Sequence, residues 1–195
     1  MILRISPLLA ALTACSGSPA PQSRINGTIR GQTFALNDVV STTGQVSFGS
    51  VSRANMGLVS MTSAAGLCAA IGAGHEKRNT EYLSFYLDVT GANGASSPPS
   101  GPGTFVVSSE LTAPNAMLAA VTFGATDASC ASVREQTAVA VSGNVSLTDV
   151  GDTAYNGSFD FTLDSNDHIT GSFHATSCPA FGAALTQGAD LTCVD

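Results

Sequence analysis

The chain has 195 residues, a formal net charge of −7 at pH 7 and only 11% charged residues. Its basic residues cluster only at residues 75–78, so it is not expected to bind nucleic acid, which requires a larger group of Lys and Arg. The length suits one domain, and the many Ser, Thr, Gly and Val residues favour strands and turns.

Residues 1–14 have the pattern of a secretory signal peptide. Arg4 makes the start positive, and residues 5–12 are mostly apolar. This apolar run is shorter than the roughly 20 residues that span a bilayer as a helix. The alternative is a first core strand with a buried cysteine, which Pro7 and the charged start disfavour.

Leu12, Thr13, Ala14 and Cys15 come next. They resemble the lipobox of bacterial lipoproteins, in which the cysteine is acylated and becomes the first residue of the mature protein. The resemblance implies diacylglycerol on Cys15, cleavage before it and attachment to a membrane of the cell envelope. Two or three acyl chains are needed for a stable anchor. Ser16, in place of Asp, is typical of family members sent to the outer membrane, on its periplasmic or outer face.

Residues 15–23 are predicted to be the acylated cysteine and a flexible tether, since the small residues and prolines that follow Cys15 lack an apolar pattern. Residues 24–195 then form a single β-rich domain. One short helix is expected near residues 63–72, and the Gly- and Pro-rich residues 91–103 are expected to be a loop. Strands are predicted at residues 25–36 with a break near Gly31, and at 45–51, 57–61, 81–89, 103–109 and 117–124.

The four remaining cysteines, in an exported chain, predict two disulfides. Cys178 is expected to pair with Cys193, since a bridge across that short segment would hold the C-terminus. Cys68 would then pair with Cys130. No two of these cysteines have the close spacing of a zinc site.

The clearest strand pattern lies in residues 138–175, where apolar and polar residues alternate over three segments. Val139, Val141 and Val145 are predicted to lie on the apolar face of the first. A three-residue turn at residues 165–167 would place Leu163 opposite Ile169 and Phe161 opposite Gly171, with Phe159 opposite Phe173. Asn166 or Asp167 would supply the positive φ that such a turn requires.

Many short strands, each with one apolar face, indicate an all-β fold, either an antiparallel β-sandwich or a flattened β-barrel. Sequence alone does not choose between them, because both need the same alternating strands and a second apolar layer.

No nucleophile, phosphate or metal motif stands out in the sequence. The strings of serine hydrolases, penicillin-binding enzymes, zinc proteases and EF-hands are absent. The acidic residues near the C-terminus are read as solvated turn residues, and His168 and His174 lie too far apart on one strand to share a metal ion. We therefore expect no metal or other cofactor.

Two classes of function remain. The first is a non-enzymatic envelope lipoprotein of binding or structural type, with an envelope protein or a glycan as partner. The second is an envelope hydrolase acting on glycans, with a site assembled from scattered residues such as Asp149, Asp160, Asp164 and His168. Paired carboxylates in a pocket would distinguish the second from the first.

Overall fold

The computed structural model describes residues 22–48, 51–188 and 190–195. The chain forms a closed eight-stranded mixed barrel with 54% of residues in strands and 11% in helices. The all-β class is therefore confirmed. The sequence left open a β-sandwich or a β-barrel, and the structure is a barrel. The predicted signal peptide, Cys15 and the predicted tether up to residue 21 lie outside the described residues.

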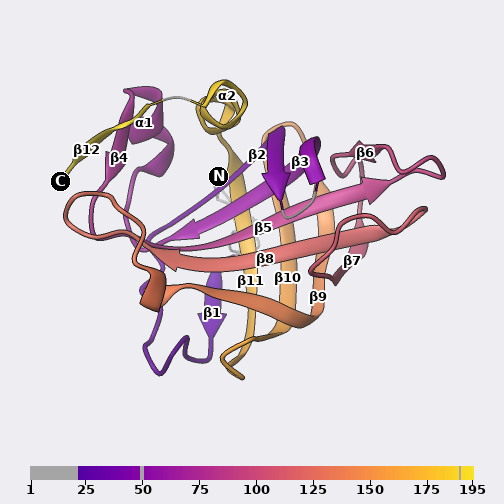
Figure 1. The fold of residues 1–195 in the computed structure, drawn as a ribbon, viewed down its shortest axis with the longest axis horizontal. Coiled ribbons are helices and arrows are strands. Elements are labelled where there is room, and N and C mark those ends of the chain that lie inside the picture. Colours follow the sequence, from indigo (N-terminus) through magenta and orange to yellow (C-terminus); the bar gives the residue numbers. More distant parts are fainter. Residues whose placement is uncertain (1–21, 49–50, 189) are drawn as a thin grey trace, which may run out of the picture.

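The barrel is built from two groups of strands that cross steeply (Figure 1). Consecutive neighbours around it are β2 (Asp38–Phe48), β3 (Val51–Thr62), β5 (Glu81–Thr90), β8 (Met117–Ala125), β7 (Gly103–Val107), β9 (Ala138–Val150), β10 (Ala154–Leu163) and β11 (His168–Ser177). The barrel closes where β11 pairs with β2 in parallel, and β7 also runs parallel to β8, so the sheet is not purely antiparallel. Outside this ring, β1 (Arg24–Asn26) pairs with β11 and β6 (Ser96–Ser97) pairs with β5, and a 3₁₀ turn, η1 (Arg134–Gln136), precedes β9.

The strand predicted at residues 81–89 is confirmed as β5, with Leu83, Phe85 and Leu87 fully buried inside the barrel. The strand predicted at residues 25–36 is wrong over most of its length. β1 ends at Asn26 because the chain turns at once, with positive φ at Gly27 and again at Arg30. The next strand, β2, starts at Asp38, seven residues before its predicted start.

The three-strand meander is confirmed as β9, β10 and β11, but its register differs by two residues from the prediction. Phe161 lies opposite Ile169 and Phe159 lies opposite Gly171. The three-residue turn begins one residue earlier than predicted: Leu163 N–H donates to Asp167 O at 2.9 Å, and Asn166 takes the positive φ of 66°. A shift by two keeps the same residues on the apolar face.

Close approach of phenylalanine rings to glycines explains this register. Each phenylalanine of β10 and β11 lies opposite a glycine of the neighbouring strand: Phe159 faces Gly171, Phe161 faces Gly143 and Phe173 faces Gly157. A Cβ on Gly171 would lie 2.4 Å from the Phe159 ring, and one on Gly157 would lie 2.7 Å from the Phe173 ring. The register predicted from the sequence would instead oppose Phe159 and Phe173.

Val139 and Val141 were predicted to face the core, and this is wrong. They are 44% and 58% exposed, while Ala138 and Ala140 are buried. In the pairing of β9 with β10, Thr162 lies opposite Ser142, but Leu163 lies opposite Ala140. This register shift is next to Gly143, whose φ is 121°. A bulge of this kind exchanges the inward and outward faces of the strand. The predicted alternation holds only beyond it, where Val145 and Leu147 are buried.

Two short helices and two short strands lie together on one outer face of the barrel (Figure 1). They are α1 (Leu67–Gly72), β4 (His75–Lys77), α2 (Pro179–Gln187) and β12 (Thr192–Val194), and we call them the cap. α1 confirms the helix expected near residues 63–72, whereas α2 was not predicted. No helix among the described residues is long and apolar enough to cross a membrane.

All four cysteines after Cys15 form disulfides, as predicted, but the predicted pairing is wrong. Cys68 pairs with Cys178, and Cys130 pairs with Cys193. The expected bridge from Cys178 to Cys193 does not form because the segment between them contains α2, whose nine residues rise about 13 Å and carry the chain away from Cys178. Each cysteine of this segment is bonded to a distant part of the chain instead.

The core makes a first prediction. Phe159→Asp should lower the free energy of unfolding by about 3 to 5 kcal/mol or prevent folding, because it places a carboxylate where Phe159 now contacts Phe85, with ring centroids 5.1 Å apart. Asp160→Ser is the matched control on the exposed face of the same strand and should change it by less than about 0.5 kcal/mol. Urea denaturation followed by circular dichroism measures both, and equal effects would contradict the observed facing of β10.

Candidate functional site

Side chains fill the interior of the barrel, so ligand sites must lie at its ends or outside it. Phe85, Phe105, Phe161 and Phe173 are among the largest fully buried side chains, and the Phe85 ring contacts those of Phe159, Phe161 and Phe173 at centroid distances of 5.1 to 6.1 Å. Two hollows outside the barrel interior are described below, one beneath the cap and one where the barrel closes. Both are bounded in part by α2.

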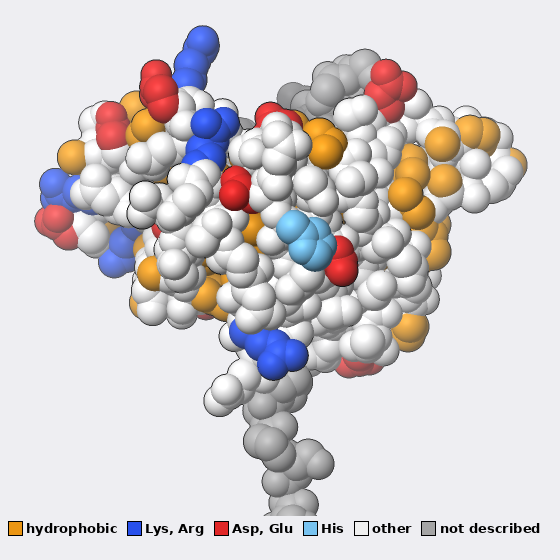
Figure 2. Space-filling model, turned by 90° about the horizontal axis from the view of Figure 1, so that it is seen from below, with side chains coloured by type: hydrophobic (Ala, Val, Ile, Leu, Met, Phe, Trp, Pro, Cys, Tyr) orange, Lys and Arg blue, Asp and Glu red, His pale blue; other side chains and the backbone are white. Residues whose placement is uncertain are grey.

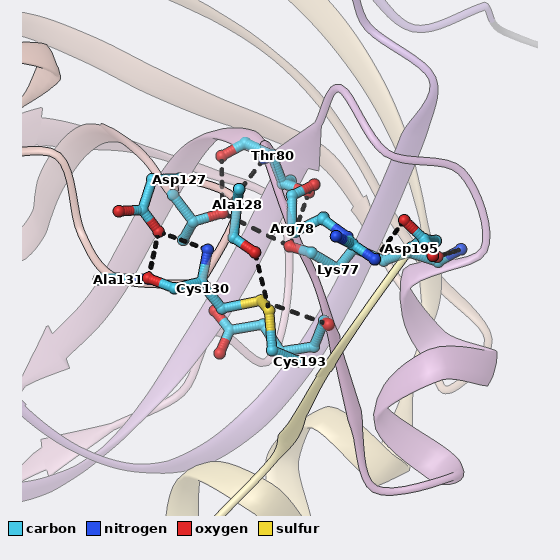
Figure 3. Close-up of a disulfide and its surroundings, with 12 residues drawn as sticks. Lys77, Arg78, Thr80, Asp127, Ala128, Cys130, Ala131, Cys193 and Asp195 are labelled. Atoms are coloured by element: carbon cyan, nitrogen blue, oxygen red, sulfur yellow. Dashed lines mark hydrogen bonds and ion pairs between the residues drawn. A yellow bond between two sulfur atoms is a disulfide. The ribbon is translucent and has the colours of Figure 1, made fainter.

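The disulfides fasten the cap at two points. The bond between Cys68 and Cys178 joins α1 to the residue before α2, and that between Cys130 and Cys193 joins β12 to the turn after β8. Figure 3 shows Asp127, Cys130 and Ala131 of this turn beside the disulfide. The Asp127 carboxylate accepts hydrogen bonds from Ser129 and from Ala131 N–H. These hydrogen bonds lower the pKa of Asp127. The turn is thus held rigidly beneath the disulfide.

The C-terminus is held on the other side of the same disulfide (Figure 3). Lys77 Nζ donates to the main-chain oxygen of Asp195 at 2.8 Å, and Arg78 forms an ion pair with the Asp195 carboxylate. β12 pairs with β4 in parallel beside these contacts. Two residues of the small basic cluster at 75–78, Lys77 and Arg78, therefore hold Asp195 beside β4.

A hollow of about 250 Å³ lies between the cap and the outer face of β3 and β5, with Thr126 just after β8 at its edge, and we call it the cap cavity. The cap contributes apolar side chains, and the barrel wall contributes hydroxyls and tyrosines. Its lining includes Leu67, Ile71, Glu76, Phe181 and Leu191 from the cap side and Ser60, Tyr82, Ser84, Tyr86 and Thr126 from the wall.

A larger groove of about 730 Å³ opens where the barrel closes, and we call it the seam groove. β11 pairs with β2 only at Thr176 and Ser177, so no described strand pairs with β2 on this side beyond Ser41. The chain turns there into α2, which lies on β2 at Gly182, where a Cβ would come within 2.5 Å of Thr43 O. The unfilled remainder of the gap is the groove.

Hydroxyl groups dominate the lining of the seam groove. The hydroxyls of Thr43, Ser100, Ser177 and Tyr155 make no hydrogen bond within the part of the chain that the structure describes. Tyr155 is only 6% exposed, and its burial raises the pKa of its phenol. The charged side chain of the lining is Asp152. The groove thus offers uncharged donors and acceptors beside one aromatic ring.

The acidic residues singled out in the sequence do not meet in a pocket. Asp160 Oδ1 lies 2.8 Å from His168 Nε2 on the exposed face of the meander. Asp149 accepts a hydrogen bond from Asn156, and Asp164 accepts one from Val139 N–H at the turn. No group of three or more potential metal ligands occurs among the described residues. Figure 2 shows one face of the molecule, on which uncharged side chains predominate and the charged ones are scattered.

Neither hollow was predicted from the sequence, because each depends on α2. Two local signals mark this helix: Pro179 at its first position and Gly188, with φ 62°, just after its end. Both are frequent at these positions of helices. The short apolar run between them was too brief to be recognised by periodicity. Comparison with protein families, curated proteins and solved structures finds no match for the chain.

Asp88 holds the loop that borders the seam groove. Its side chain is fully buried, its Oδ2 accepts a hydrogen bond from Ser96 Oγ at 2.9 Å, and its Oδ1 has no partner among the described residues. Burial raises the pKa of the Asp88 carboxyl, against the smaller effect of hydrogen bonds from Ser96 and Ser97. Pro99 of the same loop lies over Gly57 and lines the groove.

This raised pKa makes a second prediction. The folded protein disfavours the charged form of Asp88, so ionisation of this carboxyl lowers the free energy of unfolding. This loss of stability is absent below the ordinary carboxyl pKa, about 4, and grows as the pH rises through the raised pKa of the folded state. Asp88→Asn should therefore be more stable than the wild type at pH 7, with a difference that shrinks toward about pH 4. Urea midpoints at both pH values measure this, with the exposed Asp160→Asn as control. An Asn variant that is less stable at pH 7 contradicts the prediction.

Proposed function

We propose that this chain is a lipid-anchored lipoprotein of the bacterial cell envelope whose barrel binds a ligand in the seam groove. The observation that carries the binding role is the groove itself: about 730 Å³, lined by hydroxyls, with Tyr155 and a single carboxylate. Its volume lies within the range of roughly 300 to 1,000 Å³ that is usual for small-molecule sites.

The anchoring rests on Cys15 and its surroundings in the sequence. The signal-like residues 1–14 and the lipobox 12–15 lead to a tether, and β1 starts at Arg24, directly after it. Both disulfides of the domain support export, because disulfides persist outside the cytosol. Ser16 favours the outer membrane as the destination.

A neutral glycan of the envelope is the ligand class that the groove suits best. Sugar hydroxyls both donate and accept hydrogen bonds, as do Thr43, Ser100 and Ser177, whose hydroxyls have no partner within the described chain. Tyr155 adds an apolar ring beside them. A charged ligand would find Asp152 as its only ionic contact in the lining.

Binding is favoured over hydrolysis by the number of carboxylates in the groove. Glycoside hydrolases generally act through two carboxyl groups about 5 to 9.5 Å apart. The lining of the seam groove contributes Asp152, while Asp149, Asp160 and Asp164 lie outside it. The hydrolase alternative therefore needs a second acid that is not among the described lining residues.

The anchor is tested by Cys15→Ser. This variant should lose incorporation of labelled fatty acid and move from the membrane fraction to the soluble fraction, because it removes the thiol that carries the diacylglycerol. Cys68→Ser is the matched control: it removes a disulfide thiol and should leave acylation intact. Continued acylation of the Cys15 variant would overturn the proposal of a lipid anchor.

The groove is tested with the full, disulfide-bonded protein in detergent and a panel of neutral oligosaccharides, including N-acetylglucosamine oligomers. Tyr155→Phe removes only the hydroxyl and should weaken binding about 2- to 10-fold in calorimetry. Ala183→Trp, an exposed position of the groove wall, should abolish it. Ser142→Ala, an exposed hydroxyl outside the lining, is the control and should bind as the wild type does.

Two outcomes would count against this function. Binding that survives Ala183→Trp would place the ligand elsewhere. Cleavage of an oligosaccharide, detected by mass spectrometry and lost on Asp152→Asn, would favour the hydrolase in place of the binding protein.

A further inference from the structure

The cap cavity exists because small side chains of the barrel wall face a cap that is held at a fixed distance. Ser60 and Ser84 lie on the outer face of β3 and β5, both are buried, and their Oγ atoms are 3.3 Å apart. Leu67, Ile71 and Phe181 of the cap face the same space. Serines are too short to fill the gap, and the two disulfides limit how far the cap moves toward the wall.

One charge in this lining has no partner. The Glu76 carboxylate forms no hydrogen bond or ion pair within the described residues, and burial raises its pKa. The neighbouring cations are already engaged, Lys77 with the Asp195 main-chain oxygen and Arg78 with the Asp195 carboxylate. A partly buried, unpaired carboxylate beside apolar side chains is complementary to a cation that carries an apolar group.

The size of the cavity limits the ligand. An apolar protein cavity of about 150 Å³ holds one benzene molecule. The cap cavity, at about 250 Å³, has room for a ring or a short alkyl chain together with a polar end group. Tyr82, Tyr86 and Phe181 supply aromatic surface on two sides. Aromatic faces attract cations as well as apolar groups.

We propose that the cap cavity is a binding site for a small organic amine, with the ammonium group at Glu76 and an aromatic or aliphatic body of roughly six to ten non-hydrogen atoms between Leu67, Ile71 and Phe181. This site is separate from the seam groove and takes a different ligand class. Glu76 supplies the charge, and the apolar cap residues select against strongly hydrated cations.

The experiment compares four probes by calorimetry on the full, disulfide-bonded protein: phenethylamine, hexylamine, the neutral 2-phenylethanol and the anionic phenylacetate. The two amines should bind more tightly than 2-phenylethanol, and phenylacetate should bind least. Glu76→Gln should weaken amine binding roughly tenfold or more, because it removes a charge-assisted hydrogen bond, and should leave the alcohol unchanged. Glu135→Gln, an exposed carboxylate on the 3₁₀ turn η1, is the matched control.

A second variant tests the location independently of charge. Ser84→Leu fills the wall side of the cavity and should abolish binding of amines and alcohol alike, while circular dichroism and the urea midpoint report whether the barrel is retained. The proposal is overturned if the amines bind equally to wild type and Glu76→Gln, if phenylacetate binds as tightly as phenethylamine, or if no probe binds at millimolar concentration. If Ser84→Leu unfolds, Ile71→Trp replaces it as the blocking variant from the cap side.

Discussion

The packing of three phenylalanine rings against three glycines is the constraint on which the rest of the structure depends. Phe159, Phe161 and Phe173 each lie opposite a glycine of the next strand, so that bulky rings and empty positions alternate across the meander. Shifting β11 by two residues to the register predicted from the sequence would oppose Phe159 and Phe173 and would place Gly157 opposite Ala175, without a ring over it. Because Phe85 of β5 contacts all three rings, the same packing joins the meander to the other half of the barrel.

This register also determines where the barrel closes and where it stays open. With the meander fixed, β11 reaches β2 over two residue pairs only, and its end at Ser177 leads directly into α2. A helix has no free row of backbone donors and acceptors to offer a strand, so α2 covers β2 by close approach at Gly182 and does not pair with it. The space that a paired strand would fill remains as the seam groove. The proposed binding site is thus a consequence of incomplete strand pairing.

The sequence predicted those parts of the fold that depend on local alternation, and failed where distant contacts decide. β5 and the meander were found because one face of each strand is strictly apolar. The inward facing of Val139 and Val141 was predicted wrongly because the bulge beside Gly143 reverses the faces within one strand, and alternation alone does not reveal a bulge.

The register of β11 depended on the fit of Phe173 over Gly157, which is a contact across strands. The cysteine pairing failed because the shortest loop was preferred, whereas α2 separates Cys178 from Cys193. Neither hollow was foreseen, since each requires the position of α2.

The two faces of β5 show what the many hydroxyl side chains of this chain do in the structure. Inside the barrel this strand presents Leu83, Phe85 and Leu87, but its outer face is also covered, and there it carries Ser84 and Asp88, which are equally buried. A covered outer face built of large apolar residues would pack tightly against the cap and leave no space. Short hydroxyl side chains instead satisfy one another, as Ser60 and Ser84 do, and leave volume beside them. These short side chains leave room for the cap cavity, while the cap is held over the wall by the two disulfides and by Leu185 of α2, which packs against a buried apolar cluster that includes Met56 and Leu118.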